Sequence, residues 1–201
     1  GGPVMRYTLN TFFLLLGLSS FSMAQMMQMA KLVAGDAAAG DQFGHSVSIS
    51  GDYKIVGAYG DDDAGSASGS AYIFIRDGTS WSQQAKLVAS DAAWGDYFGW
   101  SVSISGDYAL VGAYYDDDGA NNSGSAYIFI RDGTSWSQQA KLAVDDAAAS
   151  DNFGHSVSIS GDYALVGAYG NDDGGSGSGS AYTRPLIPIR RSLLFFFFLF
   201  P

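Results

Sequence analysis

The sequence repeats itself with a period of 55 residues. Setting Lys31, Lys86 and Lys141 in one column aligns three units, and the first two units differ at eleven of their 55 positions. The third unit follows the pattern as far as Tyr182 and then departs from it. A repeat of this length is a single supersecondary unit that cannot bury its apolar residues alone. The period therefore restricts the chain to folds in which similar units stack on one another.

Each full unit contains four segments with the residue pattern of β-strands. In the first unit these segments are residues 45–50, 53–59, 70–76 and 79–89. Gly51-Asp52 and Asp77-Gly78 are expected hairpin turns between them, because glycine adopts backbone conformations that other residues avoid. Four short antiparallel strands repeated in tandem are typical of β-propeller blades. The sequence predicts an all-β fold of propeller-like blades, incomplete because three repeats fall short of the roughly four to eight blades that close a ring.

Stacking of the blades also predicts which apolar residues form the core. Val47 and Ile49 in the first strand segment, and Ile55 and Val56 in the second, need a neighbouring blade to cover them. The corresponding residues of the other units follow the same rule. An array with open ends exposes sheet edges, and exposed edges favour association. We therefore expect self-association through open blade edges.

The ends of the chain differ from the repeat. Met5-Arg6, the apolar stretch 12–18 and a small-x-small site at 22–24 are typical of a signal peptide cleaved near Ala24, which predicts a secreted or cell-surface protein. After Tyr182 comes a tail whose apolar run is too short to span a membrane. This tail is either a frameshifted segment or a genuine hydrophobic anchor or partner-binding tail. The expected divisions are a signal segment with upstream residues (1–24), a linker (25–30), repeats at 31–85, 86–140 and 141–182, and the tail (183–201).

The charge of the chain narrows the classes of partner. All twenty acidic residues are aspartate, and the formal net charge is −10. A chain of this charge lacks the basic face that binds phosphates, so nucleic acid is excluded as a partner. The absence of cysteine excludes disulfides and thiolate metal sites. Divalent cations or basic surfaces suit this composition better.

Two short motifs recur in register and resemble a known family. In each unit a Phe-Gly pair precedes a Gly-Ala pair by the same distance: Phe43-Gly44 with Gly57-Ala58, Phe98-Gly99 with Gly112-Ala113, and Phe153-Gly154 with Gly167-Ala168. This pattern resembles the FG-GAP repeat of integrin α-subunit propellers and of many bacterial surface proteins, over residues 31–182. The resemblance implies a β-propeller, usually seven-bladed, that acts outside the cell in recognition or adhesion.

The chain departs from that family pattern in two places. Tyr59, Tyr114 and Tyr169 stand where the family has its final proline. Integrin repeats often carry a calcium loop between their first two strands, and here that connection has shrunk to Ser-Gly-Asp-Tyr. One aspartate, such as Asp52, cannot enclose a cation that needs about six to eight oxygen ligands. We therefore do not expect the integrin calcium site in this chain.

Clusters of aspartate follow the second strand segment of each unit. Adjacent carboxylates repel one another unless water, salt or a cation screens them, and hard oxygen ligands suit Ca²⁺. One interpretation is a calcium site, and the other is a solvated loop that confers solubility and prevents edge pairing. The candidate calcium ligands are Asp61, Asp62, Asp63, Asp116, Asp117, Asp118, Asp172 and Asp173. No cofactor is otherwise predicted.

No group of residues in the repeat suggests catalysis. His45 and His155 are replaced by Trp100 in the second unit, which indicates packing rather than proton transfer or metal binding. The aspartates that precede each Phe-Gly pair are interpreted as caps of backbone N–H groups in a tight loop. They are Asp36 and Asp41, Asp91 and Asp96, and Asp146 and Asp151.

The tyrosines at 59, 114, 115 and 169 have two interpretations. They form an aromatic contact face for a glycan or protein, or they cover the blade edges. We therefore expect a non-enzymatic, secreted or surface-displayed module that recognises an extracellular protein or glycan. The alternatives are a calcium-binding structural array within a larger surface protein and the accessory propeller of a hydrolase.

Overall fold

The computed structural model describes residues 30–186. The predicted signal segment 1–24, nearly all of the predicted linker and the tail from residue 187 lie outside the described residues. The contacts divide the chain after Leu32, and the unit that begins at Val33 holds all of the strands described below. Among residues 30–186, no helix is long and apolar enough to cross a membrane.

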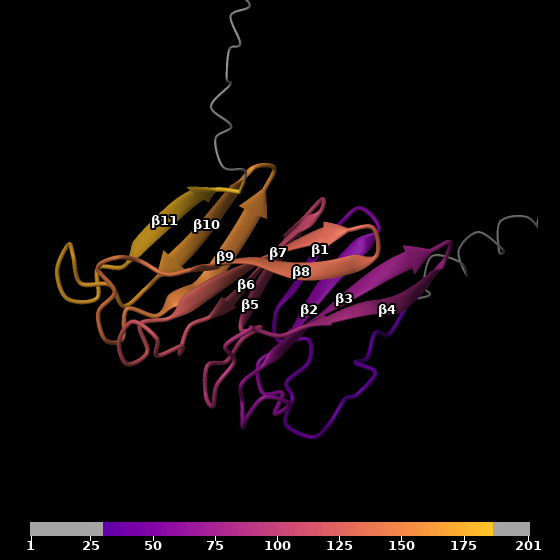
Figure 1. Cartoon of the computed structure of the whole chain (residues 1–201), viewed down its shortest axis with the longest axis horizontal. Coiled ribbons are helices and arrows are strands. Elements are labelled where there is room, and N and C mark those ends of the chain that lie inside the picture. The colour runs from indigo at the N-terminus through magenta and orange to yellow at the C-terminus, as the bar shows by residue number, and fades with distance from the viewer. Residues whose placement is uncertain (1–29, 187–201) are drawn as a thin grey trace, which may run out of the picture. The chain divides into compact units, whose positions relative to one another are not determined.

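The strands form three antiparallel sheets in chain order (Figure 1). The first sheet contains β1 (Val47–Ser50), β2 (Tyr53–Ala58), β3 (Ser70–Asp77) and β4 (Ser80–Leu87). The second contains β5 (Ser101–Ser105), β6 (Tyr108–Ala113), β7 (Ser125–Asp132) and β8 (Ser135–Leu142). The third contains β9 (Phe153–Ser160), β10 (Tyr163–Ala168) and β11 (Ser180–Pro185). The prediction of an all-β fold with incomplete, propeller-like blades is confirmed, and each sheet is called a blade from here on.

The first hairpin turn has the predicted form, and the second is shifted by one residue. Ser50 pairs with Tyr53, so Gly51-Asp52 forms the loop, and Gly51 has a φ of 55°. A glycine in this left-handed region matches the twist of the strands it joins. In the other hairpin Asp77 pairs with Ser80. The loop is therefore Gly78-Thr79 rather than the expected Asp77-Gly78, because the left-handed Gly78 takes the first loop position as Gly51 does.

The hydrogen bonds show where one blade ends along the chain. The sequence period gives the length of one unit but not the residue at which a unit begins. Strand pairing shows which strands form one sheet and so where each blade begins and ends. β4 ends at Leu87, so Lys86 belongs to the outer strand of the first blade although the repeat was divided after residue 85. β11 continues to Pro185 and pairs with β10 beyond the point where the sequence leaves the repeat pattern.

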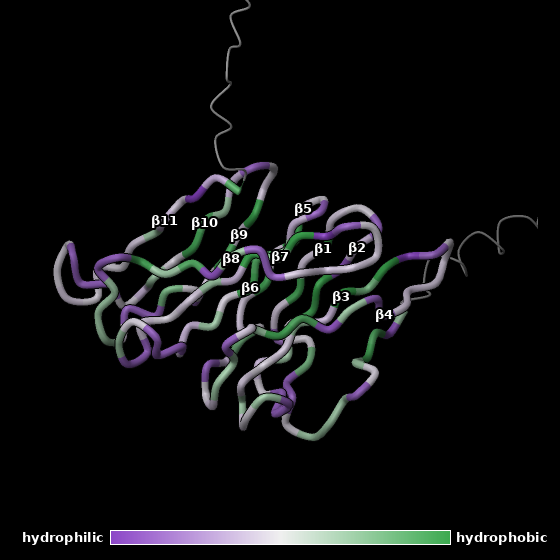
Figure 2. Tube along the Cα trace, viewed as in Figure 1, coloured by the Kyte–Doolittle hydropathy of each residue, from purple (hydrophilic) through white to green (hydrophobic). Residues whose placement is uncertain are grey.

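The core lies between adjacent blades. Figure 2 shows hydrophobic stretches along the strands and hydrophilic stretches in the turns and loops. At the first junction, Ile55 and Ile73 of the first blade lie in one buried cluster with Phe98, Val111 and Phe129 of the second. The second junction repeats this arrangement with buried residues of the second and third blades. The second blade therefore has apolar neighbours on both of its faces.

The predicted burial of Val47 and Ile49 is wrong for the first blade. Both side chains are largely exposed, at 66% and 63%, although Ile55 and Val56 are buried as expected. The equivalent Val102 of the second blade is 6% exposed because the first blade covers it. Val47 and Ile49 have no such covering blade among residues 30–186.

Candidate functional site

The Phe-Gly pair of one blade interlocks with the Gly-Ala pair of the blade before it. A Cβ atom added to Gly57 would lie 1.9 Å from the carbonyl oxygen of Gly99. The same separation, 1.9 Å, holds between a Cβ on Gly112 and the carbonyl oxygen of Gly154. Contacts below about 3 Å do not occur for real side chains, so only glycine admits the neighbouring backbone. The motif residues are therefore packing residues that join blades.

The phenylalanines of the motif anchor the same junction. Phe98 is fully buried, with its ring centroid 5.4 Å from that of Tyr127 in an edge-to-face arrangement. Phe153 is 2% exposed and meets Tyr182 in the same way at 5.5 Å. Edge-to-face pairs of aromatic rings are favoured by the ring quadrupole. The motif thus contributes an aromatic anchor and a glycine contact to each of the two junctions between blades.

Serine hydroxyls complete the hydrogen bonding between blades. The first strand of each blade lies at a sheet edge, where half of its N–H groups lack a strand partner. Ser46 Oγ accepts a hydrogen bond from the N–H of Val102 at 3.0 Å, and Ser103 Oγ accepts one from Ile159 at 3.0 Å. Buried N–H groups need such partners. The alternating serines of the first strands therefore connect neighbouring edges.

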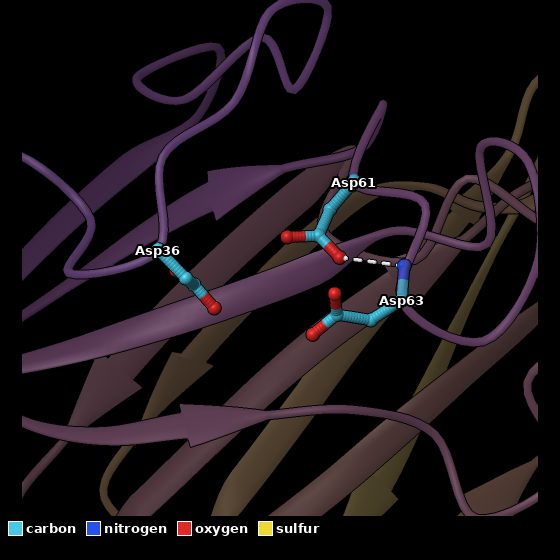
Figure 3. A group of neighbouring side chains, drawn as sticks. All are labelled: Asp36, Asp61 and Asp63. Carbon is cyan, nitrogen blue, oxygen red and sulfur yellow. Dashed lines mark hydrogen bonds between the residues drawn. The ribbon is translucent and has the colours of Figure 1, made fainter.

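The aspartate clusters are organised around a lysine. Lys86 Nζ lies 2.8 Å from Asp36 Oδ2 and 3.0 Å from Asp61 Oδ2, and it also contacts Asp63. Figure 3 shows these three aspartates turned toward one another. The Tyr72 hydroxyl lies 2.8 Å from Asp61 Oδ2 and closes the cluster from the core side. The first unit thus brings together two of its predicted calcium ligands with one aspartate that was expected only to cap a loop.

The second blade repeats the cluster with Lys141, whose ammonium group contacts Asp91, Asp116 and Asp118. In the third blade Asn171 replaces the buried aspartate and is 3% exposed. No lysine contacts Asn171 among the described residues. A buried carboxylate without a partner is costly, so an amide at the position that lacks the lysine is the expected exchange.

Electrostatics in the first cluster favour the ionised carboxylates. Burial alone would raise the pKa of Asp61, but hydrogen bonds from Lys86 and Tyr72 outweigh it and hold that pKa below its ordinary value of 3.8. The hydrogen bond from Lys86 is the main cause of the lowered pKa of Asp36. In turn, burial opposes the charge of Lys86, yet the three aspartates raise its pKa. Each cluster therefore holds a permanent internal cation.

Other predicted calcium ligands have separate roles. Asp62 Oδ1 accepts a hydrogen bond from the N–H of Ala67 at 2.7 Å, and Asp117 does the same for Asn122 at 2.6 Å. These two aspartates close the loop between the second and third strands of their blade and lie outside the lysine clusters. The three carboxylates of each cluster approach within 4.8 Å of one another, with the ammonium group among them.

The capping role expected for the second aspartate of each pair is observed. Asp41 accepts the N–H of Ala38 at 2.6 Å, and Asp96 accepts that of Ala93 at 2.7 Å. Burial raises the pKa of Asp96 to about 6. Ionisation of Asp96 therefore opposes folding. Ionisation of the aspartates in the lysine clusters has the opposite effect and favours folding.

An aromatic face extends over the three blades where the first strand begins and the second ends. In each blade the aromatic residue after the Phe-Gly pair packs against the tyrosine after the Gly-Ala pair. The centroid distances are 4.7 Å for His45 and Tyr59, 4.5 Å for Trp100 and Tyr114, and 4.5 Å for His155 and Tyr169. Trp100 lies 4.4 Å from His45 and 5.8 Å from His155, so it connects the pairs of neighbouring blades. Burial lowers the pKa of His155, so this ring packs as a neutral aromatic group. The expectation that the histidines serve packing agrees with this arrangement.

The motif geometry can now be compared with known families. A family model described as FG-GAP repeat matches residues 26–74, 81–129 and 136–183. The chain belongs to the FG-GAP repeat family. No curated protein matches the sequence. FG-GAP repeats form β-propeller-type modules that are typically non-catalytic and generally bind ligands outside the cell. The resemblance inferred from the Phe-Gly and Gly-Ala pairs is confirmed.

Proposed function

We propose that this FG-GAP chain is a non-enzymatic module, secreted or displayed at the cell surface, that recognises a protein or glycan through its aromatic face. The predicted signal segment supports this location. The aromatic face is the observation that carries the proposal, because its rings form one continuous surface across three interlocked blades. Aromatic side chains supply large contact areas at little entropic cost, and they dominate binding energy at many interfaces.

The face is partly open to a ligand. Tyr169 is 57% exposed, Tyr59 and Trp100 are half-buried, and Tyr114 is buried with 7% of its surface exposed. A ligand could therefore contact the outer parts of these rings. A rigid scaffold that presents side chains from loops is the common arrangement of recognition modules.

Trp100→His tests this proposal, because His45 and His155 fill the same position in the other blades. We expect the full chain to bind at least one member of a printed array of glycans and purified extracellular-matrix proteins. The variant should bind that ligand at least about tenfold more weakly, since tryptophan hot spots commonly contribute about 2 kcal/mol or more and about 1.4 kcal/mol is a tenfold change. Circular dichroism should show that the variant is folded, although it loses the ring contacts that Trp100 makes between blades and should melt at a lower temperature. Equal affinity of the two proteins, or no bound ligand on the array, would contradict the proposal.

A calcium-binding structural array is the second proposal, supported by three carboxylates that converge in each of two blades. Calcium would have to displace the ammonium group of Lys86 or Lys141 to reach them. If the lysines keep these positions, the full chain will melt at the same temperature in EDTA and in millimolar Ca²⁺, because an ammonium group already lies among the three carboxylates of each cluster. A higher melting temperature in Ca²⁺ would instead favour the calcium array.

Two further sequence predictions remain proposals. An accessory role beside a hydrolase would be recognised by a catalytic domain elsewhere in the parent gene. Self-association would use open blade edges, and the uncovered first blade also exposes Val47 and Ile49. Lys54 lies in this blade at the position of the buried Ala109, so a packed contact there must accommodate a charged group.

A further inference from the structure

The differences between the first two units gather at one place in the structure. Five of their eleven differing positions line a single cavity between the first two blades. In the second unit the residues at these positions are Trp94, Tyr97, Tyr115, Asn121 and Asn122. The corresponding residues of the first unit are Ala39, Gln42, Gly60, Ser66 and Ala67. An otherwise nearly exact repeat has thus acquired three aromatic rings and two amides around one cavity.

The aromatic part of the cavity offers flat surfaces. Tyr97 and Tyr115 stack with centroids 5.2 Å apart and an interplanar angle of 28°. Trp94 lies on the same cavity and has no ring partner among the described residues. The cavity volume of about 360 Å³ is at the small end of the range of roughly 300–1,000 Å³ for ligand pockets. The size and shape suit a small ligand with a flat apolar face.

The polar part of the cavity has unused hydrogen-bonding capacity. Within residues 30–186 the side-chain amides of Asn121 and Asn122 form no hydrogen bond. Asp117 uses its Oδ1 atom for the N–H of Asn122, which leaves its Oδ2 atom available. Each of these three side chains lines the cavity. A ligand that carries hydroxyl groups would find both donors and acceptors here.

The walls of the cavity are held together by backbone hydrogen bonds. The N–H of Gly95 donates to Ser66 O at 3.0 Å, and the N–H of Tyr97 donates to Ala67 O at 3.1 Å. These bonds join the loop before the second blade to a loop of the first blade. The cavity therefore exists before any ligand arrives, which reduces the entropic cost of binding.

Two of the aromatic residues oppose the stability of the fold. Tyr97 has a φ of 57°, a conformation that asparagine tolerates better than bulky residues; the position is left-handed in all three units, with Gln42 at 56° and Asn152 at 57°. Tyr115 replaces a glycine whose N–H bonds to a loop carbonyl in the other units, as Gly170 does to Asp151 at 3.1 Å. Tyr115 makes no such bond within the described part of the chain. A strained backbone such as that of Tyr97 is found more often at functional sites.

We propose that this cavity binds one unit of a neutral saccharide, an inference that rests on the proposed recognition function. The C–H groups on one face of a sugar ring carry partial positive charge and are attracted to the faces of aromatic rings. The sugar hydroxyls would pair with the side chains of Asp117, Asn121 and Asn122. The chain's net charge of −10 disfavours acidic sugars. The junction of the second and third blades lacks these rings, because Ala149, Asn152 and Gly170 occupy the positions.

The test restores the ordinary residues of the repeat. The triple variant Trp94→Ala, Tyr97→Asn and Tyr115→Gly introduces side chains that the other units already hold in these positions. The probes are neutral and sialylated oligosaccharides on a printed array, followed by calorimetry with the neutral oligosaccharide that binds best. We expect at least a tenfold loss of affinity in the variant together with an equal or higher melting temperature. A residue with a purely structural role would not combine these two results.

Tyr163→Ala is the matched control, because Tyr163 is 62% exposed and lies in β10, away from the cavity. This control should keep the affinity of the native chain. The saccharide site is overturned if no neutral oligosaccharide binds, or if the triple variant binds as tightly as the native chain. If only a protein on the array binds, and Trp100→His weakens that binding, the saccharide site fails while the recognition function stands. If nothing binds at all, both proposals fail.

Discussion

Replacing Gly112 by alanine is expected to separate the second and third blades. The new Cβ atom would lie 1.9 Å from the carbonyl oxygen of Gly154, which belongs to a backbone and cannot move aside alone. Forcing extra atoms into a packed site costs about 1–3 kcal/mol and occasionally more, and a backbone clash belongs at the upper end. We expect a loss of about 3 kcal/mol or more in the free energy of unfolding, which lowers the melting temperature by on the order of 10 °C.

Gly35→Ala is the matched control for that experiment. A Cβ at this position meets only the flexible side chain of Gln83, at 3.4 Å, and the second unit already has Ser90 there. The control should melt within a few degrees of the native chain in thermal unfolding followed by circular dichroism. If Gly112→Ala and Gly35→Ala melted together, the interlocking of Gly-Ala and Phe-Gly pairs would not hold the blades.

Replacing Lys141 by methionine is expected to destabilise the second blade strongly. Methionine keeps the aliphatic stem of the lysine but leaves the Asp116 carboxylate, whose side chain is 4% exposed, without its cation. Breaking a buried ion pair by removing one partner costs about 3–5 kcal/mol. Denaturant unfolding of the full chain should therefore show a loss of this size.

Adding Asp116→Asn to Lys141→Met should recover most of the lost stability. The third blade provides the precedent, because Asn171 occupies this position where no lysine contacts it among the described residues. The double variant removes the buried charge together with its partner. A double variant no more stable than Lys141→Met alone would show that the lysine acts by packing rather than by charge.

The pH dependence of unfolding gives a second view of the same variant. Burial opposes ionisation of Asp91, but hydrogen bonds from Lys141 and Tyr127 outweigh it and lower the pKa of this carboxyl. A carboxyl with a lowered pKa stabilises the fold above its ordinary value of 3.8, and this contribution is lost as the pH falls below that value. The native chain should therefore lose stability below about pH 4, and the gap between it and Lys141→Met should narrow there.

The sequence alone predicts the blades well because their rules are local. The 55-residue period, the alternating strands and the Gly51-Asp52 turn indicate stacked four-stranded sheets. The Phe-Gly and Gly-Ala pairs indicate the family. The burial of Val47 was mispredicted because a repeat pattern assigns every unit the same surroundings. Only the arrangement of the blades shows which face is covered.

The lysine clusters could not be predicted from adjacent residues. Asp36 and Lys86 are 50 residues apart. They meet because β4, which contains Lys86, and the loop before β1, which contains Asp36, reach the same end of the blade. A signal did exist, since lysine recurs at 86 and 141 in step with Asp36 and Asp91. The calcium prediction instead rested on the three adjacent aspartates of the first unit. Only two of them, Asp61 and Asp63, contact the lysine.

Most of the residues that line the cavity at the first junction could be recognised in the sequence only as differences between the first two units. Three of the eleven differences between the first two units introduce an aromatic ring, at 94, 97 and 115, and a fourth exchanges the ring of His45 for that of Trp100. Their gathering on one side of the molecule depends on the contact between blades, which no local pattern describes.

Tryptophan resonances offer the most direct test of recognition through the aromatic face. Fluorine NMR of the full chain labelled with 5-fluorotryptophan would follow Trp81, Trp94, Trp100 and Trp136, assigned by single replacements with phenylalanine. The probe is the array ligand that binds most tightly. The account predicts that this ligand shifts the signals of Trp94 and Trp100 and leaves those of Trp81 in β4 and Trp136 in β8 unchanged. Shifts confined to Trp81 and Trp136 would place the binding surface elsewhere and contradict the account.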